Sequence, residues 1–341
     1  MRNTNSQDFI IQKLQKRSTA SMCYDGKEAF DKWQERVRAK LWELLGMDRI
    51  EKCEDDFLIE YEEQKEGYKK LRFSFQSEAG YYVPCCALLP NNSKLPQKVA
   101  ICLQGHSSGM HISYGEPKFH GDAEMLQGGD RDFAIRALRE GYAAICIEQR
   151  YMGECGQTSE GAPSCLTRGT ALPTLLLGRT AIGERVWDVM RLIDVIKKYF
   201  PMLDHNHIVC LGNSGGGTTT FYAACLDKRI QCAVTSCSVC TFKDSIGAMH
   251  HCSCNYIPDI ANYFDMGDMG GLIAPRALVV VNGKNDEIFP DHGVSEAYTK
   301  IQETYHVAGV TNRCRLVTGE GGHRFYADLA WKEIHELMDQ R

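Results

Sequence analysis

Long apolar runs and blocks of a single charge sign are both missing from this 341-residue sequence. No stretch stays apolar over the roughly 18 residues that a membrane-spanning helix requires. The opening residues, Met-Arg-Asn-Thr-Asn-Ser-Gln-Asp, also lack the basic and then apolar pattern of a secretory signal. We therefore expect a soluble, cytoplasmic protein with no membrane partner.

The charges are nearly balanced, with 39 basic and 44 acidic residues and a formal net charge of -5. Without a long block of one sign, no nucleic-acid partner is expected. Internal repeats and low-complexity tracts are also missing. The 16 cysteines lie mostly inside apolar runs, as at Cys102, Cys146 and Cys210, rather than at the spacings of a disulfide framework. We interpret them as reduced, buried thiols.

The pattern of apolar residues changes once along the chain. Over residues 27–45, apolar positions recur at three- and four-residue steps, which predicts an amphipathic helix ended by Gly46. Three runs typical of strands follow and predict an antiparallel meander: 56–61, 70–75 and 81–89.

Beyond residue 96, buried apolar runs alternate with helical segments. This pattern predicts an α/β fold, with a mostly parallel sheet covered by helices on both faces. The predicted strands are 99–103, 143–147, 207–211, 232–236, 277–281 and 313–317, and the predicted helices are 130–140, 180–199 and one after Ser214. With the last two strands of the meander, the sheet has about eight strands.

We expect two parts in the chain. Residues 1–66 would form an N-terminal helical extension with an edge strand, and residues 67–341 the catalytic domain. Two segments near 151–178 and 241–271 interrupt the alternation of strands and helices. Long insertions of this kind are usually functional loops.

The most informative motif is Gly212-Asn213-Ser214-Gly215-Gly216, which directly follows a predicted strand and precedes a helix-compatible segment. This order of strand, sharp turn and helix predicts a nucleophile elbow with Ser214 at its tip. The flanking glycines would let the backbone pack closely around a strained serine. Taken alone, the motif is equally compatible with a glycine-rich turn that caps a helix.

Two more residues complete a catalytic pattern. Asp286 and His323 each follow a predicted strand, and the chain order of serine, acid and histidine is the one this elbow requires. His323 would act as general base on Ser214, and Asp286 would orient the histidine. Glu287 and Glu320 are the rival carboxylates.

The oxyanion of such a reaction needs donors held in place beforehand. We expect them to be the backbone N–H groups of Gly215 and of His106, which lies in the loop after the strand 99–103. The His106 side chain is expected to be a pocket wall. With these donors, neither a metal nor an organic cofactor is expected.

The elbow, the Gln104-Gly105-His106 loop and the segment Glu148-Gln149-Arg150-Tyr151-Met152-Gly153-Glu154 resemble the bacterial acetyl-xylan-esterase-like and dienelactone-hydrolase-like branch of the α/β-hydrolase superfamily. The likeness covers roughly residue 99 to the end. It implies a serine esterase that acts on a small-molecule carboxylic ester through an acyl-enzyme, with small acyl groups on a carbohydrate or related alcohol favoured. Glucuronoyl esterases place an arginine after the nucleophile, whereas this sequence has Gly215.

Residues on both insertions are candidates for the substrate pocket: Arg150, Tyr151, Arg179, His251 and Tyr256. Arg150 and Arg179 could bind an anionic group or pair with structural carboxylates. The thiols and imidazoles between Cys237 and Cys254 could hold zinc. Their spacing does not form two clean ligand pairs. We therefore expect this segment to line the pocket and no metal to be bound.

Three alternatives stay open. An acyltransferase or a peptidase could use the same fold and nucleophile, although fewer than 100 residues precede Val99 and leave no room for a propeller domain. A non-catalytic binding protein is disfavoured by the complete triad. The sequence does not determine the oligomeric state.

Overall fold

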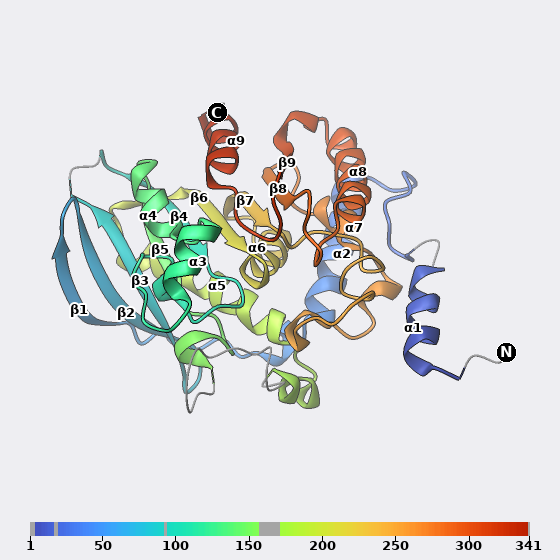
Figure 1. The fold of residues 1–341 in the computed structure, drawn as a ribbon, viewed down its shortest axis with the longest axis horizontal. Coiled ribbons are helices and arrows are strands. Elements are labelled where there is room, and N and C mark those ends of the chain that lie inside the picture. Colours follow the sequence, from blue (N-terminus) through green and yellow to red (C-terminus); the bar gives the residue numbers. More distant parts are fainter. Residues whose placement is uncertain (1–3, 17–19, 92–93, 157–170, 340–341) are drawn as a thin grey trace.

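A nine-stranded sheet forms the centre of the molecule (Figure 1). The computed structural model describes residues 4–16, 20–91, 94–156 and 171–339. The strands are β1 (Leu58–Lys65), β2 (Tyr68–Glu78), β3 (Tyr81–Pro90), β4 (Gln97–Leu103), β5 (Ala143–Ile147), β6 (Leu203–Asn213), β7 (Ile230–Ser236), β8 (Ala277–Gly283) and β9 (Cys314–Gly319). Their spatial order is β1-β2-β3-β5-β4-β6-β7-β8-β9.

The sheet is parallel over its larger part. Strands β5, β4, β6, β7, β8 and β9 pair in parallel. The antiparallel β1, β2 and β3 form one edge. This arrangement confirms the predicted α/β fold and its antiparallel leading edge. The sheet has nine strands rather than about eight because β1 also joins it, with Leu58 opposite Ser74 and Lys65 opposite Tyr68.

Helices cover both faces of the sheet (Figure 1). They are α1 (Ser6–Gln15), α2 (Phe30–Leu44), α3 (Asp122–Gly129), α4 (Phe133–Arg139), α5 (Ala181–Tyr199), α6 (Gly215–Leu226), α7 (Met266–Gly270), α8 (Asp291–Val307) and α9 (Ala327–Asp339). Successive residues of β4 face opposite sides, so Val99 and Ile101 join one core cluster and Ala100 and Cys102 the other. The first cluster includes side chains of α2, α5, α6, α7 and α8, and the second those of α4 and α9.

The sequence analysis predicted α2, α4, α5 and α6 but missed α1, α3, α7, α8 and α9, although α8 and α9 have buried faces. In α2, Trp33, Val37 and Leu41 are buried on one stripe, which is the pattern that predicted it. Helix α1 has no buried residue and lies at the opposite end of the molecule from β1 (Figure 1). A helix without a buried face leaves little apolar periodicity in the sequence.

The predicted insertions differ in how far they are described. In the segment 151–178, residues 157–170 lie outside the described residues. The segment 241–271 consists mainly of turns, two short 3₁₀ helices and α7. No disulfide joins the cysteines that the structure describes. Within the same residues, every helix is too short or too polar to cross a bilayer.

Candidate active site

Ser214 occupies a strained turn between β6 and α6. Its φ of 54° and ψ of -123° lie in a region that non-glycine residues rarely adopt. The neighbouring glycines make the turn possible, since a Cβ on Gly212 would lie 2.5 Å from the carbonyl carbon of Gly216. The Ser214 N–H donates to Ser236 O of β7 at 2.8 Å. The local geometry is therefore that of a nucleophile elbow.

Asp286 and His323 meet beyond the ends of β8 and β9. His323 Nδ1 lies 2.8 Å from Asp286 Oδ2. The other carboxylate oxygen, Oδ1, accepts the N–H groups of Ile288 at 2.8 Å and Phe289 at 3.1 Å. Burial opposes ionisation, but the bond and charge of His323 and these N–H groups outweigh it and lower the pKa of Asp286. An ionised Asp286 fixes the proton on Nδ1 and leaves Nε2 as a base.

The rival carboxylates point elsewhere. Glu287 is exposed, and Glu320 is exposed and pairs with Lys284 at 3.2 Å. Asp286 is the carboxylate hydrogen-bonded to His323 among the described residues. This geometry agrees with the predicted assignment of the acid, whose catalytic role stays a prediction.

The end of β7 links the serine to the histidine. Ser236 accepts the Ser214 N–H, while Ser236 Oγ and Cys237 Sγ lie 3.4 Å and 3.3 Å from Arg324 O, next to His323. Cys237 Sγ, a carboxylate oxygen of Asp286 and a ring nitrogen of His323 all lie within 4.8 Å of one another. Burial and the Asp286 charge raise the pKa of Cys237 to about 12, so this thiol is neutral and unsuited to be a nucleophile.

The loop after β4 packs directly against the elbow. Gly105 has no room for a side chain, because a Cβ there would lie 2.6 Å from Asn213 O and 3.0 Å from Ser214 Cβ. The His106 ring contacts Gly215, with its Cε1 2.9 Å from the position of a Cβ on that glycine. Both predicted oxyanion residues are thus brought together beside Ser214. Whether their N–H groups bind an oxyanion stays a prediction.

Gln149 holds this loop in place, a role that the sequence analysis missed. Its Nε2 donates to Gln104 O, and its Oε1 accepts a hydrogen bond from Thr219 Oγ1 of α6 at 2.6 Å. Gln104 Nε2 in turn donates to Arg131 O at 2.7 Å. The amide connects three segments that are distant in sequence, so no local pattern could reveal it.

Arg131 is a buried cation next to the serine. A Cβ on Gly105 would lie 3.1 Å from Arg131 Nη1, close to Ser214 Cβ. Neither Nε nor Nη1 of Arg131 has a hydrogen-bond partner among the described residues. Burial lowers its pKa to about 10, so the guanidinium is charged at neutral pH. Its field favours negative charge that develops near Ser214.

The two arginines predicted for the substrate pocket form ion pairs. Arg150 pairs with Asp188 at 2.8 Å and with Glu78 at 3.1 Å. Arg179 pairs with Glu78 at 2.6 Å and with Glu184 at 2.9 Å. Both arginines are thus engaged with carboxylates, and a contact of either one with substrate stays a prediction. Pairing with structural carboxylates was one of the two possibilities that the sequence analysis left open for these arginines.

Tyr151 belongs to the same network. Its hydroxyl donates to Glu184 Oε2 at 2.5 Å, and its backbone has a positive φ of 68°. Burial, followed by the Glu184 charge, raises its pKa. The hydroxyl is thus engaged with a carboxylate of α5, and its contact with substrate stays a prediction.

His251 lies near His323. Its ring packs edge-on against Phe289 at 5.5 Å, and Phe289 stacks on His323 at 6.0 Å. Ser245 Oγ donates to Ile288 O at 2.7 Å and therefore accepts from His251 Nε2 at 3.1 Å. Burial, then repulsion from His106 and His323, lowers the pKa of His251 to about 4. A neutral His251 beside the site fits the predicted pocket wall.

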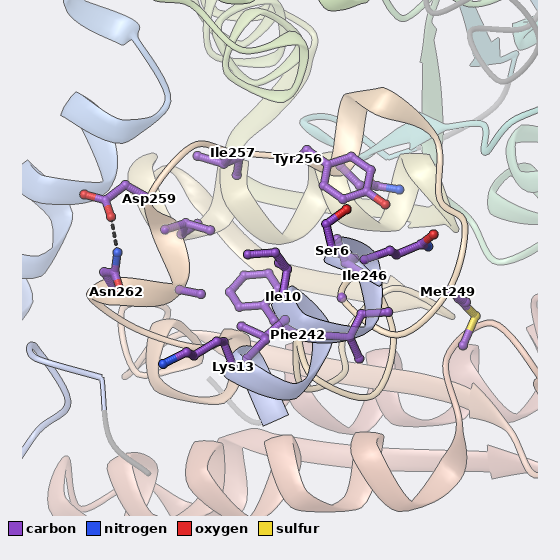
Figure 2. Close-up of a pocket in the computed structure, with 17 residues that line it drawn as sticks. Ser6, Ile10, Lys13, Phe242, Ile246, Met249, Tyr256, Ile257, Asp259 and Asn262 are labelled. Carbon is purple, nitrogen blue, oxygen red and sulfur yellow. Dashed lines mark hydrogen bonds between the residues drawn. The ribbon is translucent and has the colours of Figure 1, made fainter. Parts of the chain in front are cut away.

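Tyr256 lies in a separate cavity of about 910 Å³ between α1 and the segment 241–271 (Figure 2). Ile10 and Phe242 line the same space. None of Ser214, Asp286 and His323 is among the described residues around it. The candidate site is therefore located by the Asp286–His323 pair, which lies outside this cavity.

Glu148, at the end of β5, is a fully buried carboxyl group. It accepts the Met110 N–H at 3.2 Å and 3.1 Å and the Glu154 N–H at 3.4 Å. Despite these bonds, burial raises its pKa to about 8. The group is mostly protonated in the folded protein at neutral pH, but ionised in the unfolded chain.

Stability should therefore depend on the ionisation of Glu148. The folded state binds the extra proton between about pH 4.5 and 8, so this carboxyl lowers the free energy of unfolding progressively as pH rises through that window. Glu148→Gln removes the carboxyl group that binds this extra proton on folding. As pH rises from 5 to 8, the free energy of unfolding of the variant should increase relative to that of the unchanged protein by on the order of a few kcal/mol, as measured by urea unfolding. The exposed control Glu287→Gln should show no gain, and parallel pH profiles for all three proteins would contradict the prediction.

A model of the Abhydrolase family matches residues 6–315. The chain belongs to this family. The match confirms the α/β-hydrolase superfamily that the elbow motif and the loop 104–106 indicated, and it classes the chain as a hydrolase. A Bacillus subtilis (strain 168) protein named "Putative hydrolase YtaP" is 24% identical over 218 residues, which are 62% of this chain and 70% of that protein.

Solved structures share the Abhydrolase fold over nearly the whole chain. One, described as a "putative acetyl xylan esterase" from Bacteroides fragilis NCTC 9343, has a TM-score of 0.78 at 18% identity and covers 94% of this chain and 83% of its own. A glucuronoyl esterase from Solibacter usitatus has a TM-score of 0.68 at 14% identity, with coverages of 95% and 97%. At such identities the likeness is one of fold.

Proposed function

We propose that this Abhydrolase-family protein is a serine esterase that cleaves carboxylic esters through an acyl-enzyme on Ser214. The observation that carries the proposal is the strained backbone of Ser214 at the tip of the β6–α6 turn. Strain of this kind persists where packing enforces it, and it clusters at functional sites. The Asp286–His323 pair at the neighbouring strand ends supplies the base that a serine nucleophile needs.

The steps follow from these groups. Ser214 Oγ attacks the ester carbonyl carbon while His323 Nε2 accepts the hydroxyl proton, and Asp286 stabilises the imidazolium that forms. The N–H groups of Gly215 and His106 bind the oxyanion. His323 then protonates the leaving alcohol. Water attacks the acyl-enzyme with His323 again as base, which releases the carboxylic acid and restores Ser214.

The favoured substrate is a small acyl group on a carbohydrate or related alcohol. The names of the structural relatives point to carbohydrate esters. The His106 ring and the Met152 methyl pack closely against Gly215, 2.9 Å and 3.0 Å from the position of a Cβ there, and leave little space on this side of the elbow. A longer chain would have to displace one of them.

A panel of p-nitrophenyl esters tests this preference. We expect kcat/KM for the acetate to exceed that for the hexanoate by at least about tenfold, since a few misplaced methylenes cost 1–3 kcal/mol. Met152→Ala should lower the ratio of kcat/KM for the acetate to kcat/KM for the hexanoate, because it opens the space beside Gly215. Acetylated xylose oligomers should be deacetylated as well. Equal rates on all chain lengths would contradict the short acyl pocket, and no turnover of any ester would contradict the esterase.

A further inference from the structure

A cluster of one imidazole and two thiols lies beside the proposed oxyanion loop. His106 Nε2 is 3.3 Å from Cys254 Sγ. One ring nitrogen of His106 and the Sγ atoms of Cys252 and Cys254 all lie within 4.8 Å of one another. Both cysteines are buried, and His106 is partly buried. These atoms converge from two segments of the chain that are far apart in sequence.

We propose that His106, Cys252 and Cys254 bind a Zn²⁺-class divalent cation. Thiolate sulfur and imidazole nitrogen are the ligands that tetrahedral zinc prefers, and three protein ligands leave one position for water. With Zn–S near 2.3 Å and Zn–N near 2.0 Å, tetrahedral geometry puts N and S ligands about 3.6 Å apart and two S ligands about 3.8 Å apart. The observed spacing is close to that arrangement, so small side-chain movements suffice.

Charge and surroundings also fit an ion. Two thiolates and a neutral imidazole cancel a divalent charge, so the occupied site carries no net charge into a buried region. Cys252 and Cys254 pack in a small cluster with Met152, Ala171 and Ala181, which are all apolar. Binding would release the two thiol protons to solvent, which makes affinity rise with pH.

The ion would tie the loop after β4 to the segment 241–271. The Cε1–Nδ1 edge of the His106 ring contacts Gly215, while Nε2 faces Cys254. A ligated ring would therefore fix the loop that is proposed to hold the oxyanion, without the ion touching Ser214. The role is structural, and the site is separate from the Asp286–His323 pair. Six cysteines and histidines lie from Cys237 to Cys254, and two of them, Cys252 and Cys254, belong to this proposed metal site.

Titration of chelator-treated, reduced protein with Zn²⁺ and with Co²⁺ tests the site. We expect one ion per chain and, with Co²⁺, a thiolate-to-metal charge-transfer band. At free Zn²⁺ a hundredfold above its Kd, the Tm should rise by about 4 °C. Cys252→Ser and Cys254→Ser should each weaken binding by more than tenfold, since even outer-shell changes cost about 10–100-fold.

Two further variants make the test specific. Cys240→Ser, an equivalent change directly before that segment and outside the cluster, should bind the ion with unchanged affinity. Ser214→Ala should also bind it normally, so the metal site and the esterase can fail independently. Absence of the charge-transfer band, or equal affinity of Cys254→Ser and the unchanged protein, would overturn the proposal. Loss of ester turnover on chelation with no change in Tm would overturn the structural role.

Discussion

Ser214→Ala should lower ester turnover by about four to six orders of magnitude, because the other groups of the site cannot replace an activated nucleophile. Residual rate enhancement would come from binding and from the oxyanion donors. The fold should stay intact, because alanine fits the space that Ser214 occupies and the close packing of Gly212 against Gly216 is unchanged.

The control for this change is Ser238→Ala. Ser238 is buried, close to Gly217 of α6, and its Oγ has no hydrogen-bond partner among the described residues. Its removal should leave kcat within about twofold, as most changes away from functional contacts do. A Ser214→Ala protein that keeps a tenth or more of the ester turnover would contradict the assignment of the nucleophile.

Asp286→Asn should lower kcat by about 10⁴-fold while preserving the local turn. The asparagine carbonyl oxygen can still accept the Ile288 and Phe289 N–H groups that bind Oδ1. Its amide then donates to His323 Nδ1, which forces the ring proton onto Nε2 and removes the base that the proposed mechanism assigns to Ser214. Unfolding by urea should show little change.

Glu287→Gln and Glu320→Gln are the matched comparisons for Asp286→Asn. Both carboxylates are exposed, and Glu320 bonds to Lys284 at the surface. Each variant should keep kcat within about twofold. If either one is more damaging than Asp286→Asn, the acid of the triad has been assigned to the wrong residue.

The sequence predicted the parallel sheet and the elbow because both leave local patterns. Buried strands read as continuous apolar runs, and the Ala143–Ile147 strand has the predicted bounds. The Ser214 turn needs glycine at fixed offsets, which a motif captures.

Contacts between residues that are distant in sequence could not be predicted. Arg150 and Arg179 were considered for substrate because their carboxylate partners, Glu78 and Asp188, lie on β2 and α5. Cys237 was grouped with its neighbours in sequence, whereas a positive φ of 47° turns it toward the Asp286–His323 pair. His106 could not be paired with Cys254 from spacing.

Labelling with a fluorophosphonate followed by mass spectrometry tests the central claim most directly. The reagent phosphonylates an activated serine, so one label per chain is expected on the peptide that contains Ser214. His323→Ala should abolish labelling while leaving Ser214 in place, because the serine then lacks its base. A label on another serine, or no label on a folded protein, would contradict the account.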